Sequence, residues 1–315
     1  MRIVFMGTPD FAVPSLEALL RSGDTVAGVV TQPDRPKGRG QTLAASPIKQ
    51  LAQREGLPIL QPLKMKDPEF LAALRSWEPD FIAVAAFGRI LPQVILDMPP
   101  KGCINVHASL LPKFRGAGPI QWAIINGETQ TGITTMLMDE GMDTGAMLLQ
   151  EAIPITQDDT TDTLVPRLAE LGGRLLVETI SRLKMGTLSP RPQDTSQATL
   201  APLLKKEDGV IDWALPATTL ANRVRGLSPW PGAYTTVAGD DRWIIWRARA
   251  LPGPVTKPPG TIMAVTTDAI QVATGEGILA VMELQPKNSR RMAVSQYVTG
   301  HPTAVGLQLG GPALP

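Results

Sequence analysis

The sequence predicts an α/β fold, in which a Rossmann-like, mostly parallel sheet domain precedes a small C-terminal β-barrel domain of OB-like type. The first half alternates short apolar runs with amphipathic stretches, as the strands and helices of βαβ units do. In the last third, short β-type runs are separated by Gly, Pro and Asp turns, which is typical of a small barrel or sandwich. The 30 prolines and 29 glycines indicate many turns between short elements.

The first half begins with an apolar run that predicts a strand, followed by a turn into a helix. Ser46 and Asp67 each stand before a proline, as a cap stands before the first helical position. Residues 80–86 predict an apolar strand of the kind found in the middle of a parallel sheet. The expected strands are residues 3–6, 26–31, 58–60, 80–86, 102–107 and 131–138. The expected helices are residues 11–21, 47–55, 120–126 and 162–185, and one that begins at Asp67.

The second half is expected to hold one helix and several short strands. A polar, proline-containing stretch precedes them and has the composition of a linker. We therefore expect a sheet domain at residues 1–188, a linker at 189–204 and a barrel domain at 205–315. The chain from His301 is poor in charge and rich in Gly and Pro, so we expect a loose tail. The expected helix is 217–225, and the expected strands are 234–237, 243–248, 261–265, 270–273 and 278–284.

The composition excludes several classes of protein. A formal net charge of +1 argues against a general binder of polyanions. The single cysteine, Cys103, excludes an internal disulfide and fits a reducing compartment. We find no signal peptide and no apolar run near the ~18 residues of a membrane helix. With two histidines and one cysteine far apart, we expect no metal site. The sequence thus predicts a cytoplasmic protein, and no feature calls for an obligate protein partner, so we expect a monomer.

Three expected strand ends converge on one place. In doubly wound sheets the ligand crevice lies beyond the carboxyl ends of the strands, at a topological switch point. Residues 7–8, residues 87–88 and His107 all fall at such ends. The first loop, residues 7–10, is not a G-x-G-x-x-G sequence, so a nicotinamide cofactor is disfavoured.

The clearest chemical feature is a set of one Asn, one His and one Asp. Asn105 and His107 are two apart on an expected strand, so their side chains face the same side of the sheet. Asp143 lies in a turn-rich loop from which its carboxylate can reach the imidazole. An amide donor beside a titratable ring can stabilise an oxyanion and move a proton. A lone histidine is more often a buried structural residue, but the Asn and Asp partners favour an acyl-transfer centre.

Two apolar segments at strand ends predict the walls of a small-molecule slot. Directly after the histidine, a turn ends the strand and offers backbone groups and apolar faces to a planar ring. A second segment leaves another strand end in the same way. An ordinary strand-ending turn is the competing interpretation. The expected wall residues are Ser109, Leu110, Leu111 and Pro112, together with Phe87, Ile90, Leu91 and Pro92.

The stretch at residues 31–41 is the longest basic loop of the first half. Arg35, Lys37 and Arg39 stand among glycines and prolines, which suits phosphate contacts from an adaptable loop. A solvated surface loop is the alternative. The C-terminal strands also mix arginines with aromatic residues, as surfaces that bind single-stranded nucleic acid do, although many of those aromatics should belong to the core.

Taken together, these residues resemble the folate-dependent formyltransferase family. The Asn105–Pro112 run with Asp143 is similar to the pattern shared by the whole family. The basic loop at 31–41, residues 7–11, residues 115–121 and the C-terminal β domain are similar to the branch whose acceptor is methionyl-tRNA. The resemblance spans about residues 2–290, and nothing is carried over to the tail beyond it.

The resemblance implies 10-formyltetrahydrofolate as formyl donor and the α-amino group of methionyl initiator tRNA as acceptor. It implies that Asn105, His107 and Asp143 are catalytic, that the apolar walls hold the pterin, and that Arg35, Lys37 and Arg39 with the barrel domain contact the acceptor stem. Other acceptors, such as a sugar nucleotide or a purine precursor, and hydrolysis of the folate by water remain alternatives. A non-catalytic folate-binding or RNA-binding module is a further one.

Overall fold

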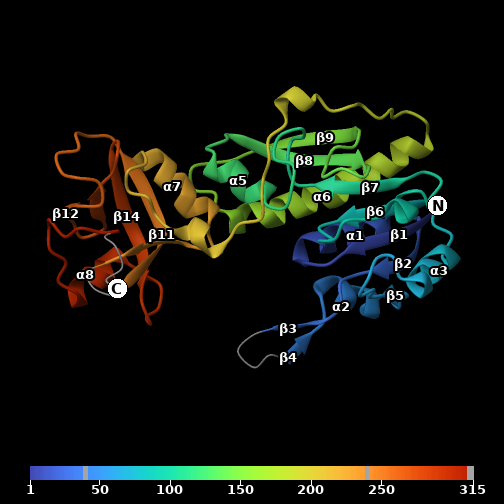
Figure 1. The fold of residues 1–315 in the computed structure, drawn as a ribbon, viewed down its shortest axis with the longest axis horizontal. Coiled ribbons are helices and arrows are strands. Elements are labelled where there is room, and N and C mark those ends of the chain that lie inside the picture. The colour runs from blue at the N-terminus through green and yellow to red at the C-terminus, as the bar shows by residue number, and fades with distance from the viewer. Residues whose placement is uncertain (38–41, 238–240, 311–315) are drawn as a thin grey trace. The chain divides into compact units, whose positions relative to one another are not determined.

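The computed structural model describes residues 1–37, 42–237 and 241–310, and these form two compact units (Figure 1). Unit 1 comprises residues 1–119, 130–154 and 165–202. Unit 2 comprises residues 120–129, 155–164 and 203–315. Two short segments from the first half therefore cluster with the C-terminal part. The expected domain limits at residues 188 and 205 stay a prediction.

Unit 1 contains a seven-stranded sheet with the order β5-β2-β1-β6-β7-β8-β9. The first five strands of this order are parallel, and β8 and β9 are antiparallel to their neighbours. This confirms the mostly parallel α/β fold. The strands are β1 (Arg2–Gly7), β2 (Thr25–Val30), β5 (Ile59–Leu60), β6 (Phe81–Ala85), β7 (Cys103–His107), β8 (Gln130–Leu137) and β9 (Met147–Pro154).

The structure contains every helix expected in the first half and one short helix, Gln93–Leu96, that the sequence did not predict. The Ser46 hydroxyl accepts a hydrogen bond from the Lys49 amide, and the Asp67 carboxylate accepts from the amides of Glu69 and Phe70. Both caps satisfy amides that lack a partner in the first helical turn. The helices of the whole chain up to the linker are α1 (Val13–Arg21), α2 (Pro47–Arg54), α3 (Pro68–Ser76), α4 (Gln93–Leu96), α5 (Pro119–Ile125) and α6 (Thr161–Lys184), with a short 3₁₀ turn η1 (Asp10–Ala12).

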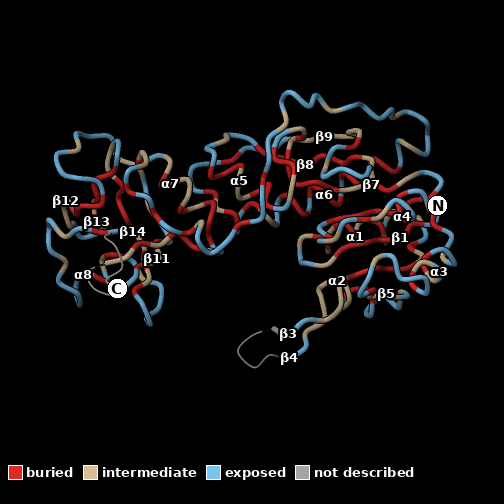
Figure 2. The backbone as a smooth tube through the Cα atoms, in the orientation of Figure 1, coloured by how far each residue is buried: buried red, intermediate tan, exposed pale blue. Residues whose placement is uncertain are grey.

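The centre of the sheet is also the centre of the core of unit 1. Every residue of β6 is buried, as are the residues of β1 from Ile3 to Met6, which Figure 2 shows as red tube. The chain order reverses between β1 and β6, so a topological switch point lies between these two strands. Thr8 Oγ and Gln32 Nε2 both donate to the Phe87 carbonyl, at 3.1 and 2.8 Å. Loops that follow β1, β2 and β6 are thereby joined at the carboxyl ends of their strands.

The basic stretch at residues 31–41 is more regular than expected. It contains the strand β3 (Arg35–Lys37), which pairs antiparallel with β4 (Thr42–Ala44). The expectation of a long irregular loop was therefore wrong for its described residues, because the backbone groups of the two arms pair with each other. Residues 38–41, which include Arg39, lie outside the described residues.

Unit 2 contains an antiparallel sheet with the order β10-β11-β14-β13-β12, and β15 pairs with β14. Helix α7 packs against β11 and β14. Trp243, Leu284 and Val294 are fully or almost fully buried in its core. Its elements after residue 203 are η3 (Lys206–Gly209), α7 (Ala217–Gly226), β10 (Ala233–Thr236), β11 (Arg242–Leu251), β12 (Ile262–Val265), β13 (Ile270–Ala273), β14 (Ile278–Pro286), β15 (Met292–Ala293) and α8 (Val294–Gly300), whereas the 3₁₀ turn η2 (Thr195–Gln197) belongs to unit 1.

The chain after α8 is not loose up to residue 310. Residues 306–309 exchange hydrogen bonds with residues 260–262, beside β12. The Gly310 amide then donates to the carbonyl of Thr236, which ends β10. Leu309 is only 1% exposed. This segment thus joins the two edge strands of the sheet, which explains the barrel-like character of the domain and corrects the expected loose tail.

The expected linker also has a defined path. Its described residues lie along unit 1, where Arg191 exchanges backbone hydrogen bonds with Met147 and Arg115 does the same with Thr199 and Ala201. Across the described part of the chain, no helix is long and apolar enough to cross a membrane.

Candidate active site

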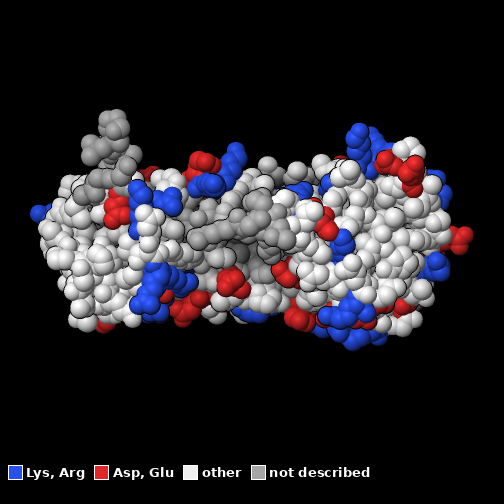
Figure 3. Space-filling view, turned by 90° about the horizontal axis from the view of Figure 1, so that it is seen from below, with Lys and Arg blue, Asp and Glu red and all other residues white. Residues whose placement is uncertain are grey.

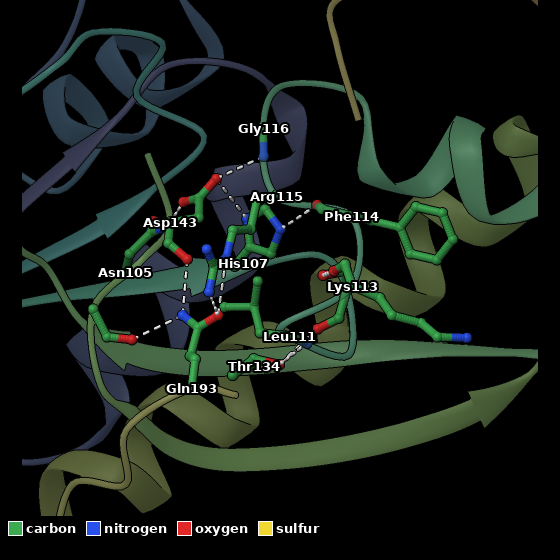
Figure 4. Close-up of polar contacts among 12 residues, drawn as sticks. Asn105, His107, Leu111, Lys113, Phe114, Arg115, Gly116, Thr134, Asp143 and Gln193 are labelled. Carbon is green, nitrogen blue, oxygen red and sulfur yellow. Dashed lines mark hydrogen bonds and ion pairs between the residues drawn. The ribbon is translucent and has the colours of Figure 1, made fainter. Parts of the chain in front are cut away.

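The structure brings Asn105, His107 and Asp143 together, although Asp143 is far from the other two in the sequence. Both Asn105 and His107 lie on β7, and Asp143 lies in the loop between β8 and β9 (Figure 4). Asn105 Nδ2 donates to Asp143 Oδ1 at 3.3 Å, and His107 Nδ1 lies 3.6 Å from Asp143 Oδ2. One carboxylate therefore contacts both side chains, through a different oxygen for each.

His107 is held in a single orientation by its other nitrogen. Nε2 lies 2.9 Å from the carbonyl oxygen of Phe114. A carbonyl can only accept, so the ring carries a hydrogen on Nε2. The imidazole is 5% exposed. Nδ1, which faces the carboxylate, is consequently the ring nitrogen that remains for chemistry.

Asp143 is held by its own loop and by the loop after β7. Its Oδ2 accepts a hydrogen bond from the Gly116 amide at 2.9 Å. The turn before it is closed by Asp139, whose Oδ1 accepts from the Gly141 amide and the Thr144 hydroxyl. Asp143 itself has a φ of +54°, a backbone conformation that costs a non-glycine residue about 1–3 kcal/mol. Surrounding contacts must therefore stabilise this conformation.

Two side chains that were not among the predicted site residues, Gln193 and Arg115, tie these loops together. The Gln193 amide nitrogen donates to the carbonyls of Asp143 and Gly145, at 2.8 Å each. Its amide oxygen accepts from Nε and Nη2 of Arg115, at 3.1 and 2.8 Å. Gln193, which is half-buried, comes from the expected linker, where composition gave no sign of a structural role. Arg115, only 8% exposed, belongs to residues 115–121, which entered the sequence analysis only through the family resemblance.

The turn after His107 is more buried, and makes more hydrogen bonds within the protein, than expected. Ser109 and Leu111 are 0% and 3% exposed, and their main-chain groups already have partners. The Thr134 hydroxyl donates to the Ser109 carbonyl and accepts from the Leu111 amide, while Gln150 Nε2 donates to the Leu111 carbonyl. Each of these backbone groups therefore already has one hydrogen-bond partner within the protein. Leu110 and Pro112, which are half-buried, remain as apolar surface.

The second expected wall lies beside an open cavity of about 620 Å³. Ile90, Leu91 and Pro92 line it, and Ile90 is 80% exposed. Phe87, however, is 2% exposed, packs in the core of unit 1 and does not line this cavity, so its part in the wall stays a prediction. An apolar strand end was visible in the sequence, but which of its residues turn inward was not. The other lining residues are Lys64, Met65, Lys66, Gln93 and Glu140.

A further open cavity, of about 430 Å³, lies at the switch point. Its lining includes Thr8 and Gln32 at the strand ends and Arg35 of the β3–β4 hairpin. Arg35 is exposed, and its Nη2 donates to Gln32 Oε1 at 2.6 Å. One of the three expected phosphate-contacting cations therefore lies at a cavity. Lys37 ends β3, and Arg39 is outside the described residues.

The described residues contain no group of three or more His, Cys, Asp or Glu side chains placed to hold a metal ion. The polar groups at the end of β7 instead form an organic acid–base centre: an amide donor, a carboxylate and an imidazole with one nitrogen fixed. Such a set fits the transfer of an acyl-type group.

Comparison with known proteins places this chain among the formyltransferases. Residues 1–180 match the model of the formyl transferase family, and residues 203–302 match that of the formyl transferase C-terminal domain. The chain belongs to the formyl transferase family.

The similar proteins point to one branch of it. The methionyl-tRNA formyltransferase of Trichlorobacter lovleyi is 51% identical over 308 residues, which cover 98% of this chain and 96% of that protein. The N-formyltransferase of Helicobacter canadensis, solved with folinic acid and dTDP-3-aminofucose, has a TM-score of 0.66 at 17% identity, covering 92% of this chain and 99% of its own. HypX of Aquifex aeolicus, solved with tetrahydrofolic acid, has a TM-score of 0.59 at 18% identity, covering 95% and 47%. The two solved structures show the shared fold.

Proposed function

We propose that this enzyme transfers the formyl group of 10-formyltetrahydrofolate to the α-amino group of methionyl initiator tRNA. The observation that carries the proposal is the contact of one carboxylate, Asp143, with both Asn105 and His107 at the end of β7. The match to methionyl-tRNA formyltransferases over almost the whole length of both chains supports the choice of acceptor.

The cavity beside Ile90–Pro92 suits the folate. Its apolar wall can cover a planar pterin, and about 620 Å³ falls within the range of small-molecule sites. Leu110 and Pro112 would extend this apolar surface next to His107. Folate is a substrate in this mechanism, and side chains of the protein supply the hydrogen-bond donors and the base that accepts the proton.

The chemistry follows from the contacts of the three side chains. The amine attacks the formyl carbon, the new C–N bond forms, and the carbonyl oxygen becomes an oxyanion. The Asn105 amide keeps one hydrogen for Asp143 and has a second for the oxyanion. A protonated His107 would add Nδ1–H as a second donor. Loss of one such donor costs about 10²–10³ in rate.

Asp143 would accept the proton that the amine loses on attack. The bond from the formyl carbon to the folate nitrogen then breaks, and the same proton passes from Asp143 to that nitrogen, so tetrahydrofolate leaves with a neutral amine. Because Nε2 of His107 stays bonded to the Phe114 carbonyl, only the Nδ1 side of the ring faces these steps.

The acceptor would approach from the switch-point side. The cavity lined by Thr8, Gln32 and Arg35 opens at the carboxyl ends of the strands, where ligands bind in such sheets. Arg35, Lys37 and Arg39, with the barrel domain, would hold the acceptor stem. We further propose that the enzyme is cytoplasmic and monomeric and that it needs no metal.

A formyl-transfer assay tests the function directly. Purified protein with 10-formyltetrahydrofolate should formylate methionyl initiator tRNA much faster than the methionyl elongator tRNA. His107→Ala and Asp143→Ala should each leave less than a few per cent of turnover, with folate affinity within about tenfold of wild type, because both act in the transition state.

The same assay separates the alternatives. Formylation of small amines or sugar nucleotides in place of tRNA would identify another acceptor, and release of formate without an acceptor would identify a hydrolase. Tight folate binding by an inactive protein would indicate a binding module. Substantial activity in either variant would contradict the proposed mechanism.

A further inference from the structure

A segment that sequence composition marks as a linker crosses the two loops that position the catalytic groups. We call residues 193–201 the strap. At its far end, Ala201 accepts from the Gly118 amide and donates to the Arg115 carbonyl. Thr199 accepts from the Arg115 amide through its carbonyl and from the Phe114 amide through its hydroxyl. The strap therefore holds the loop whose Phe114 carbonyl fixes the ring of His107.

At its near end the strap holds the other loop. Gln193 donates to the carbonyls of Asp143 and Gly145 and accepts from the Arg115 guanidinium (Figure 4). One side chain thus joins the loop that carries Asp143 to the loop that carries Arg115 and Gly116. Gly116 in turn donates its amide to the Asp143 carboxylate.

The backbone of both loops needs such support. Asp143 and Phe114 have φ values of +54° and +63°, in the left-handed region that favours glycine. Gly116, at φ +120°, passes so close to the strap that a Cβ there would lie 2.7 Å from the Ala201 carbonyl. The two residues with unfavourable backbone conformations, and the glycine that passes close to the strap, therefore all lie in the loops to which the strap is hydrogen-bonded.

We propose that Gln193 is a positioning residue for the formyl transfer. It acts through Asp143 and Arg115, and sets the distance between the carboxylate and His107 Nδ1. The kinetic test of this role rests on the proposed function, whereas the spectroscopic test described below does not. Displacement of a reacting group by about 1 Å can cost on the order of 10²-fold in rate.

Kinetics of two variants test the role. Gln193→Ala removes all four hydrogen bonds, whereas Gln193→Glu keeps an acceptor for Arg115 and removes the donor to Asp143 and Gly145. We expect kcat to fall about 10–100-fold in both variants, with KM for tRNA and folate within about threefold of wild type. Gln197→Ala is the matched control, because Gln197 is exposed, lies in the same segment and donates only to Asp194. It should retain wild-type kcat.

The imidazole provides a second readout that needs no substrate. The chain has only two histidines, so ¹H–¹⁵N spectra of the rings contain one signal set from His107 and one from His301. His301→Gln assigns them. In Gln193→Ala and Gln193→Glu we expect the His107 signals to shift or broaden while those of His301, stacked on Tyr297, stay unchanged.

The inference stands only if kcat and the His107 signals both change in folded protein, as judged by circular dichroism and thermal unfolding. Wild-type kcat in Gln193→Glu, unchanged His107 signals, or a loss shared by Gln197→Ala or explained by unfolding would each overturn it. If the wild type transfers no formyl group, the proposed function fails instead, and the spectra still decide whether Gln193 positions His107.

Discussion

At the residue scale, the site depends on main-chain acceptors as much as on its three side chains. The Phe114 carbonyl fixes which nitrogen of His107 carries a hydrogen, and the Gly116 amide orients the Asp143 carboxylate. Both come from the loop after β7, whose path cannot be derived from residue type. Asn105 and His107, in contrast, share a face of β7 simply because they are two residues apart.

The thiol of Cys103, at the start of the same strand, gives a prediction at this scale. Burial, followed by the charge of Asp97, raises its pKa to about 12. The thiolate is the reactive form, so native protein at pH 8 should react with a disulfide reagent at least about a thousandfold more slowly than a free thiol. The rate is measured by thiolate release.

Unfolded protein is the control, and it should yield one equivalent at once because Cys103 is the only cysteine. Fast labelling of the native protein would show that β7 opens readily and that the buried arrangement around Asn105 and His107 is not maintained.

At the scale of elements, strands and capped helices were predictable, and their pairing partners were not. Ser46 and Asp67 cap helices as their positions before proline indicate. The strand β9 was not predicted, and β8 was not expected to run antiparallel to its neighbours. Strand direction depends on which strands pair in the folded protein, and the local sequence pattern does not contain this information. The same holds for the β3–β4 hairpin. Likewise, backbone hydrogen bonds hold the Gly-rich tail between β12 and β10, which its composition did not predict.

The tail gives the second prediction. Leu309→Ala should destabilise the protein by about 2–5 kcal/mol, because it removes a side chain that is 1% exposed from the core of unit 2. Urea unfolding, followed by tryptophan fluorescence, measures the change. Val305→Ala, at a residue 61% exposed, should leave the unfolding midpoint within error. Equal midpoints for the two variants would mean that the tail does not contribute to the barrel.

At the scale of the whole molecule, charge is balanced rather than concentrated. The formal net charge is +1, and the face drawn in Figure 3 mixes Lys and Arg with Asp and Glu. Several arginines of unit 2 already have structural partners: Arg225 donates to the carbonyls of Thr156 and Asp159, and Arg291 pairs with Glu283. Contact with tRNA is therefore expected to involve few cations.

This balance predicts how salt affects the reaction. The logarithm of kcat/KM for methionyl-tRNA should fall linearly with the logarithm of salt concentration, while KM for folate changes little. Arg35→Ala should reduce that slope by about one unit and weaken use of all tRNA sequences alike. Arg39→Ala should likewise weaken tRNA use far more than folate binding.

Arg89→Ala is a matched control, since Arg89 Nη1 is bonded to the Leu63 carbonyl. Its salt slope should equal that of the wild type. Equal losses of tRNA use and folate binding in Arg35→Ala or Arg39→Ala would contradict the assignment of this hairpin to tRNA.

The α/β class, the central strands, the helix caps and the shared face of Asn105 and His107 could all be predicted from the residues alone, because each depends on short-range periodicity or on neighbouring residues. The loop position of Asp143 predicts its contact with His107, but its second contact, with Asn105, and the burial of Phe87 in the core are visible only in the folded protein. The folded protein also shows that part of the expected linker is the strap, whose Gln193 joins Asp143 to Arg115. These features depend on contacts between residues far apart in the chain, and such contacts leave no periodic trace in the sequence.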